Sequence, residues 1–192
     1  IVVNTTSFTL NGADAANYSL TQPTLSANIT AASLTINGLT AANKAYDGGT
    51  DATATGTGSL VGITVGDTVG LTGTPSYAFA TPGVGTNIVV NTTSFTLNGA
   101  DAANYSLTQP TLSANITAAS LTINGLTAAN KAYDGGTDAT ATGTASLVGI
   151  TDGDTVGLTG TPSYAFATAG VGTNIVVNTT SFTLNGADAA NY

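Results

Sequence analysis

The sequence predicts an all-β protein, built from tandem Ig-like antiparallel β-sandwich repeats with about seven short strands in each 87-residue unit. Three observations predict this fold class. The chain repeats itself every 87 residues, its apolar residues gather in short runs, and Gly, Asn, Asp and Pro separate those runs at close spacing. No segment of useful length has the period of about 3.6 residues that marks an amphipathic helix. Such close punctuation is typical of a sandwich or barrel.

The repeat becomes visible when the chain is laid over itself. The segment that begins Ile-Val-Val-Asn-Thr-Thr at Ile1 recurs at Ile88 and at Ile175. The two full periods differ at three positions, Gly58/Ala145, Val65/Asp152 and Pro82/Ala169. An 87-residue period is too long for one coil of a β-solenoid and has the size of a small independent domain.

Seven short runs in one period are predicted strands, because most are rich in β-branched or aromatic residues. In chain order they are residues 34–36, 59–61, 68–71, 77–79, 88–90, 95–97 and 112–116. The stretches 13–17 and 39–43 both follow Asn-Gly and predict compact Ala-rich turns. The core is expected to hold the large aromatic residues beside Val, Ile and Leu, namely Tyr46, Tyr77, Phe79, Phe95 and Tyr105.

On this frame the chain divides into three parts. Residues 1–31 form the C-terminal part of a preceding repeat, residues 32–118 a complete repeat, and residues 119–192 the N-terminal part of the next. Short Ala-Ala connections join them, so we expect successive repeats to be held in a fixed relation. The last repeat is expected to lack its final strands, and an open sheet edge invites pairing with another chain.

The charges exclude several classes of function. All ten acidic residues are Asp, the cations are Lys44 and Lys131, and the formal net charge is −8. So acidic a surface cannot neutralise phosphates, so we expect no nucleic-acid partner. No apolar run reaches the roughly 18 residues of a membrane helix, so no membrane insertion is expected. The chain has no Cys and no His, and we predict no catalytic residues.

One loop per repeat is a candidate calcium site. Asp47 and Asp51 flank a Gly pair, and Asp134 and Asp138 repeat the arrangement. Oxygen ligands on a flexible loop suit calcium. The alternative is that these Asp side chains hydrogen-bond their own backbone in a turn. No other cofactor is expected.

Two further alternatives concern single residues in each repeat. Lys44 and Lys131 stand two residues before a Tyr and are candidates for an isopeptide crosslink to Asn or Asp; the alternative is an Asp-paired surface Lys. Tyr18, Tyr105 and Tyr192 follow Ala-Ala-Asn and form either a sugar-stacking surface or buried corners of the fold.

Four segments together resemble a known module. The first runs from Leu34-Thr-Ile-Asn-Gly through Tyr46-Asp47-Gly48. The other three are Val65-Gly-Asp-Thr-Val-Gly-Leu71, the segment that begins Leu97-Asn-Gly-Ala-Asp, and Ala114-Asn-Ile-Thr117. This order resembles the YDG-type repeat, a tandem module of large secreted bacterial proteins that include filamentous-haemagglutinin-like exoproteins and other adhesins. The resemblance implies an extracellular place at the bacterial cell surface or matrix, and it supplies no catalytic residues.

The sequence therefore predicts a non-catalytic structural segment, a stalk or spacer in a long extracellular fibre. Its expected partners are the neighbouring repeats of the same chain. One alternative is a self-assembling filament, in which a strand such as residues 1–10 completes a sheet in another copy. The other alternative is a module that binds glycan or calcium.

Overall fold

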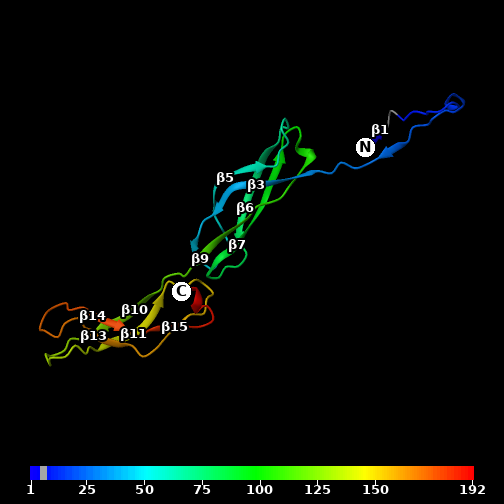
Figure 1. The fold of residues 1–192 in the computed structure, drawn as a ribbon. Coiled ribbons are helices and arrows are strands. Elements are labelled where there is room, and N and C mark those ends of the chain that lie inside the picture. The colour runs from blue at the N-terminus through cyan, green and yellow to red at the C-terminus, as the bar shows by residue number, and fades with distance from the viewer. Residues whose placement is uncertain (5–7) are drawn as a thin grey trace. The chain divides into compact units, whose positions relative to one another are not determined.

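The computed structural model describes residues 1–4 and 8–192 (Figure 1). It is nearly all β, with 48% of residues in strands and 5% in helices, which confirms the predicted fold class. The described helices are short 3₁₀ turns, η1 (Ala15–Asn17), η2 (Ala102–Asn104) and η3 (Ala189–Asn191). No helix in the described residues is long and apolar enough to cross a membrane.

The described chain forms two compact units. The first contains Ile1–Asn37, Gly58–Thr74 and Phe95–Gln109, and the second contains Gly38–Thr57, Pro75–Ser94 and Pro110–Tyr192. Each unit therefore gathers segments that lie far apart in the sequence.

The first unit holds a hairpin and a three-stranded sheet. In the hairpin, β1 (Val2–Asn4) pairs antiparallel with β2 (Thr24–Ser26). The sheet has the order β5-β3-β8, with β3 at Ala32–Ala41, β5 at Ala54–Val61 and β8 at Tyr105–Leu107; β3 and β5 continue into the second unit. Leu34 is fully buried and Tyr105 nearly so, and they give this part its apolar interior.

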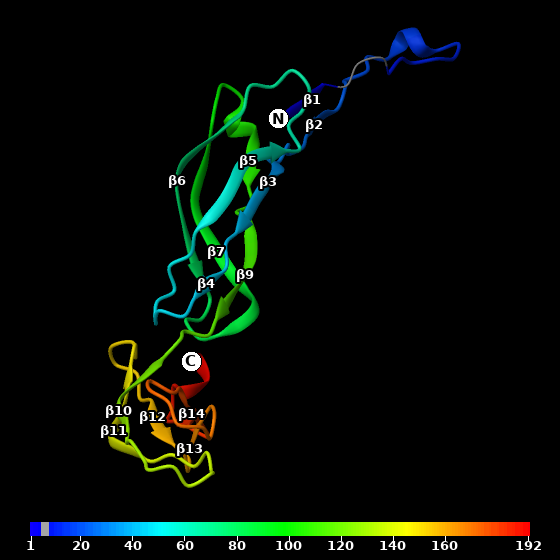
Figure 2. The same cartoon turned by 90° about the vertical axis from the view of Figure 1, so that its left-hand side faces the viewer.

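The second unit holds the larger core, on a four-stranded sheet of order β4-β9-β7-β6 (Figure 2). These strands are β4 (Lys44–Ala45), β6 (Gly70–Phe79), which begins in the first unit, β7 (Gly85–Asn98), which ends there, and β9 (Thr111–Thr117). The buried cluster consists of Tyr46, Phe79, Val90, Ala114 and Ile116. Burying aromatic and branched side chains together is the main stabilising contribution to a fold of this kind.

Residues 119–192, which we call the C-terminal repeat, also belong to the second unit and form three strand pairs. The pairs are β10 (Thr122–Ala128) with β11 (Ala141–Val148), β12 (Gly157–Thr159) with β15 (Thr183–Asn185), and β13 (Ser163–Phe166) with β14 (Val177–Thr180). All three pairs are antiparallel.

Residues 32–118, which we call the complete repeat, contain seven strands, the number predicted, but the strands themselves differ, since β4 and β8 were not predicted. The predicted strand 77–79 and the second half of 68–71 join into β6, and 88–90 and 95–97 join into β7. Pro75 was expected to end a strand, yet β6 runs through it. An edge strand tolerates Pro because one side of it has no partner to receive an N–H, and β6 is an edge strand.

Two strand pairings correct the antiparallel prediction. The pairs β3 with β8 and β4 with β9 are parallel. In both, a strand from the beginning of the repeat meets one from its end, so no hairpin forces an antiparallel arrangement. The Ig-like sandwich stays a prediction.

The two predicted Ala-rich turns have different outcomes. Residues 13–17 contain η1, as predicted. Residues 39–43 do not form a turn of this kind, because β3 continues to Ala41 and Ala42 donates its N–H to the Thr53 carbonyl at 2.8 Å. Strand pairing with β5 therefore overrides the local turn signal.

Candidate interaction site between the repeats

A tyrosine and an aspartate hold one corner of each repeat. In the C-terminal repeat the Tyr192 hydroxyl donates to Asp154 Oδ2 at 2.6 Å and accepts from the Thr151 N–H at 2.8 Å. In the complete repeat Tyr105 makes the same bonds, to Asp67 Oδ2 at 2.6 Å and from the Thr64 N–H at 3.0 Å. Identical local sequence thus builds the same corner twice.

A second tyrosine joins the corner of the C-terminal repeat from the complete repeat. The hydroxyl of Tyr46 lies 2.9 and 3.1 Å from the two carboxylate oxygens of Asp154. Its ring meets that of Tyr192 edge to face, with centroids 5.6 Å apart and planes at 77°. This is a favourable geometry for an aromatic pair. One Asp carboxylate therefore accepts from two tyrosines of successive repeats, and we call these three residues the Tyr46–Asp154–Tyr192 clasp.

Backbone contacts surround the clasp. Asn191 accepts from the Val84 N–H through Oδ1 at 3.1 Å and from the Ala119 N–H through its carbonyl at 2.9 Å. Gly48 has a φ of +78°, and a Cβ there would lie 3.0 Å from the Thr151 methyl. Positive φ and close approach both favour glycine at the third position of the Tyr-Asp-Gly motif.

The surroundings of Tyr46 keep its hydroxyl protonated. Burial, then the hydrogen bond to Asp154 and the charge of that carboxylate, raise the pKa of Tyr46 from 10.0 to about 12. A neutral phenol donates a proton to a carboxylate and a phenolate does not. Tyr46 therefore stays a donor to Asp154 until the pH approaches about 12.

The candidate calcium residue Asp47 is occupied by its own loop. Its Oδ1 accepts from Lys44 Nζ at 2.6 Å and from the Gly49 N–H at 2.9 Å, and Lys44 also donates to the Gly49 carbonyl at 2.8 Å. The hydrogen bond from Lys44, followed by that from Gly49, holds the pKa of Asp47 below 3.8. These are the contacts that the turn alternative predicts.

The second copy of the loop repeats this arrangement. Lys131 Nζ lies 2.7 Å from Asp134 Oδ1 and 2.9 Å from the Gly136 carbonyl, and the pKa of Asp134 is lowered chiefly by Lys131. The backbones of Asp51 and Asp138 form isolated antiparallel β-bridges with Ala78 and Ala165, respectively. Across the described ranges, no three potential metal-ligating side chains gather. The calcium site and the Lys crosslinks stay predictions.

The three tyrosines after Ala-Ala-Asn are placed differently. Tyr105 and Tyr192 form the corners, as the alternative to sugar stacking predicts. Tyr18 is 72% exposed in the N-terminal segment.

Sequence reasoning missed the role of Tyr46 as a partner of the next repeat. It placed Tyr46 in the core and Asp154 in a turn. Neither placement includes the hydrogen bond that joins the two residues across the repeats. The signal was present: Tyr46 and its copy Tyr133 lie outside every predicted strand, beside a Gly pair. Only the three-dimensional contact identifies its partner.

Comparison with known proteins finds one family. A model described as "YDG domain" matches residues 30–112 and again residues 117–192. No curated protein and no solved structure matches the chain. The two matched ranges cover most of the chain and follow one another as consecutive repeats.

Proposed function

Because the chain belongs to the YDG domain family and carries two consecutive copies, we propose that it is a structural tandem-repeat segment. It serves as a stalk or spacer in a long extracellular bacterial fibre, at the cell surface or in the matrix, and it performs no catalysis. The resemblance of its motifs to repeats of large secreted adhesins supports this place. The scarcity of acid–base side chains supports a mechanical role.

The Tyr46–Asp154–Tyr192 clasp carries the proposal. A spacer keeps its two ends apart only when neighbouring domains are held to each other, since domains on free linkers reorient. Tyr46 is supplied by one repeat and Asp154 and Tyr192 by the next, with Tyr46 buried at 8% exposure. The clasp therefore resists bending at the point where the repeats meet.

The connection between the repeats supports the same function. The complete repeat ends with β9 at Thr117, and β10 begins at Thr122. Within this short connection the Ala119 N–H is bonded to the Asn191 carbonyl. A connection fixed by the repeat that follows it gives the junction little freedom.

The test measures how freely the two repeats move. Spin labels are attached to Val89→Cys and Val148→Cys, both exposed positions of the second unit, in a chain with no other Cys. The distance distribution between the labels is then recorded. We expect a narrow distribution for the parent chain and a broader one for Tyr46→Phe, which removes the hydroxyl donor of the clasp.

Tyr133→Phe is the matched control. It makes the same change in the same motif, but Tyr133 is 70% exposed, whereas Tyr46 is 8% exposed and bonded to Asp154. Its distribution should equal that of the parent chain. If the parent distribution is as broad as that of Tyr46→Phe, the two repeats move independently of each other. That result would refute the spacer mechanism.

A further inference from the structure

The loop that carries Tyr46 has the same internal structure in both repeats. We call residues 44–50 and their copy 131–137 the YDG loops. In each loop the Lys Nζ donates to the Asp side chain and to a Gly carbonyl, and the N–H of that Gly donates to the same Asp oxygen. The corresponding distances in the two loops differ by at most 0.1 Å. The first glycine of each pair, Gly48 or Gly135, has a φ of +78° or +80°.

Each YDG loop is attached to an aromatic residue of its own repeat. The N–H of Phe79, at the end of β6, donates to the Thr50 carbonyl at 2.7 Å, and Phe166, at the end of β13, repeats this bond at 2.7 Å. Lys44 Nζ lies 5.8 Å from the centre of the Phe79 ring, and Lys131 Nζ lies 5.9 Å from that of Phe166. A cation over an aromatic face at this distance is attracted to it. The lysine therefore closes the loop and also binds it to the sheet.

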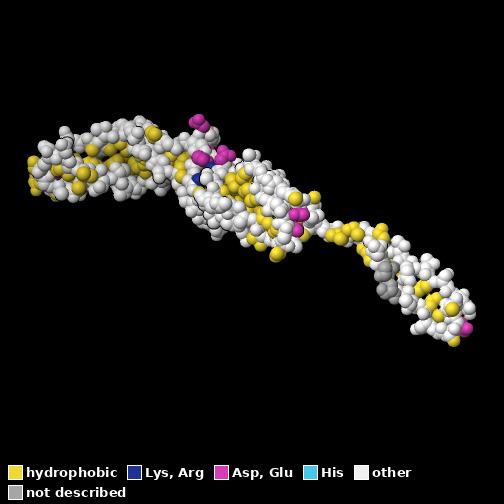
Figure 3. Space-filling model, turned by 90° about the horizontal axis from the view of Figure 1, so that it is seen from above, with side chains coloured by type: hydrophobic (Ala, Val, Ile, Leu, Met, Phe, Trp, Pro, Cys, Tyr) yellow, Lys and Arg dark blue, Asp and Glu magenta, His cyan; other side chains and the backbone are white. Residues whose placement is uncertain are grey.

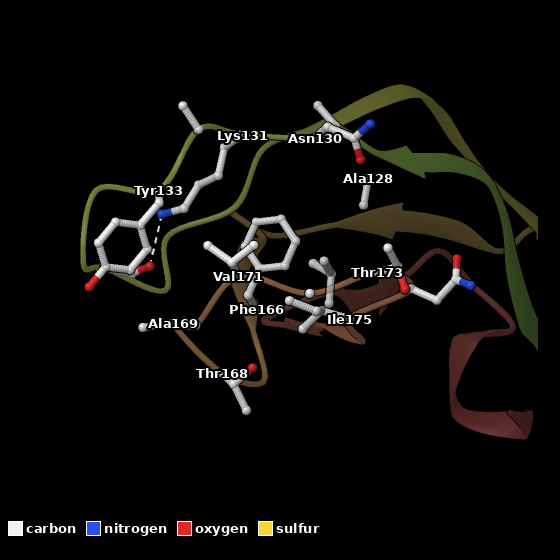
Figure 4. Close-up of a pocket in the computed structure, with 17 residues that line it drawn as sticks. Ala128, Asn130, Lys131, Tyr133, Phe166, Thr168, Ala169, Val171, Thr173 and Ile175 are labelled. Atoms are coloured by element: carbon white, nitrogen blue, oxygen red, sulfur yellow. Dashed lines mark hydrogen bonds between the residues drawn. The ribbon is translucent and has the colours of Figure 1, made fainter.

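The two loops differ in what their tyrosine contacts. Tyr46 is 8% exposed and bonded to Asp154, whereas Tyr133 is 70% exposed. Figure 4 shows the second YDG loop, with Lys131 extending along it to the hydrogen bond that the dashed line marks. The loop thus has the same conformation whether its tyrosine is buried against another repeat or exposed. The contact with Asp154 does not create this conformation.

A loop that is already formed lowers the cost of docking. A segment that becomes ordered only on contact loses conformational entropy at that moment, and this loss weakens the interaction. Gly48 and Gly49 are consecutive, so a loop without the lysine contacts would be flexible. The Lys44 side chain is 18% exposed. In the space-filling view charged side chains are few, and the visible Lys surface lies beside Asp side chains (Figure 3), so little competes for either partner.

We propose that Lys44 is a positioning residue of the junction: it holds the YDG loop in the conformation that presents Tyr46 to Asp154 of the following repeat. The inference rests on the proposed function, because it names the residue that prepares the clasp for contact. It also gives each residue of the Tyr-Asp-Gly motif a separate role. Tyr46 makes the contact, Asp47 holds the lysine, and Gly48 supplies the positive φ and permits the close approach to the next repeat.

The test uses the chain with spin labels at Val89→Cys and Val148→Cys. Lys44→Gln should broaden the distance distribution relative to the parent chain, because the loop no longer holds Tyr46 in place. Lys131→Gln is the matched control: it makes the same change in the same loop, and its distribution should equal that of the parent chain. Urea unfolding should show the same small loss of stability in both variants, so that a difference between their distributions reports position and not folding.

A second measurement observes the clasp directly. The ring centroids of Tyr46 and Tyr192 lie 5.6 Å apart, so their ring protons should give a nuclear Overhauser effect in the parent chain. This signal should be lost in Lys44→Gln and persist in the matched control. Both measurements are made on dilute protein, because assembly through residues 1–10 stays a prediction; residues 5–7 of that segment lie outside the described residues.

The outcomes separate this inference from the proposed function. If the parent distribution is narrow and stays as narrow in Lys44→Gln, the inference is overturned and the spacer mechanism stands. Equal broadening in Lys44→Gln and Lys131→Gln also overturns the inference, since the effect would then not depend on the contact of the tyrosine. If the parent distribution is already broad, the spacer mechanism fails, and the Overhauser signal decides: a signal that is unchanged in Lys44→Gln, or absent from the parent chain, overturns the inference as well.

Discussion

The complete repeat and the C-terminal repeat have nearly the same sequence and different structures. Tyr46 is 8% exposed and its copy Tyr133 is 70% exposed. Leu34 is fully buried, whereas Leu121 is only half-buried. The complete repeat has β9 in its sheet and another repeat against Tyr46, and the C-terminal repeat has neither. The comparison teaches that the environment of a residue in this array is set by the neighbouring segment as much as by its own repeat.

The sequence differences do not explain the contrast. The positions that differ are Gly58/Ala145, Val65/Asp152 and Pro82/Ala169, and none of these six residues is buried. Val65 is fully exposed, so its replacement by Asp152 changes only a turn at the surface. Exposed substitutions of this kind have small effects on stability.

The largest expected difference between the repeats is in their cores. Phe79→Ala removes a side chain that is 3% exposed and should cost about 3–5 kcal/mol of unfolding free energy. Phe166→Ala removes its half-buried counterpart and should cost clearly less. Hydrogen exchange of the amides in each repeat measures both. If the two variants lose equal unfolding free energy, the cores of the two repeats are equally well packed, which contradicts the difference described above.

The next effect concerns the Asp at the corner of each repeat. Asp154 accepts from Tyr46 and Tyr192, whereas Asp67 accepts from Tyr105. Hydrogen bonds to a charged group contribute about 1.5–3 kcal/mol each. Asp154→Ala should therefore destabilise its repeat more than Asp67→Ala does, as measured by urea unfolding. The reverse order would show that the second tyrosine contributes nothing.

Alkaline pH should act on the clasp. The pKa of Tyr46 is raised from 10.0 to about 12, so the folded state keeps its proton where the unfolded state loses it. The stabilisation is present in full below pH 10 and is lost as the pH rises toward about 12. The spin-label distribution should broaden over this range in the parent chain, and Tyr46→Phe should show no such transition at the clasp. A parent distribution that is unchanged up to pH 12 would contradict the assignment.

The smallest effect should be the same in both repeats. The pKa values of Asp47 and Asp134 lie below 3.8, so each ion pair with Lys stabilises the fold above that pH and is lost as the pH falls through the lowered value. Both carboxylates are about 60% exposed (61% and 62%), where solvent weakens the pair. Lys44→Gln and Lys131→Gln should shift the acid unfolding midpoint slightly and equally. A large shift in one repeat alone would show that this loop also depends on its neighbours.

Much of the fold could be predicted from the repeat and its turns. The all-β class, the positions of β3, β5, β6, β7 and β9, and the helical turn at 15–17 follow from local patterns. The continuous β6 could not be predicted, because Pro75 is compatible with a strand only at a sheet edge, and position in the sheet is a tertiary property. The parallel pairing of β3 with β8 likewise joins segments about 70 residues apart, and local patterns do not report such pairings.

The candidate site was predicted only in its parts. The tyrosines and the Asp turns were singled out, but the contact between Tyr46 and Asp154 spans 108 residues and crosses from one repeat to the next. Near-identical repeats hide such contacts, because the sequence cannot distinguish a partner within the repeat from the same residue in its neighbour.

The most direct test of the central claim is hydrogen exchange along β7, at residues 85–89, and at their counterparts 172–176 in the C-terminal repeat. The account predicts fast exchange at residues 172–176 in this chain and slow exchange at the counterpart residues 85–89, where β9 pairs. When a copy of residues 19–31, which include the sequence of β9, is added after Tyr192, the amides of 172–176 should become as protected as those of 85–89. If the amides of 172–176 exchange equally fast with and without the added segment, the absence of a strand equivalent to β9 is not the cause of the difference between the two repeats.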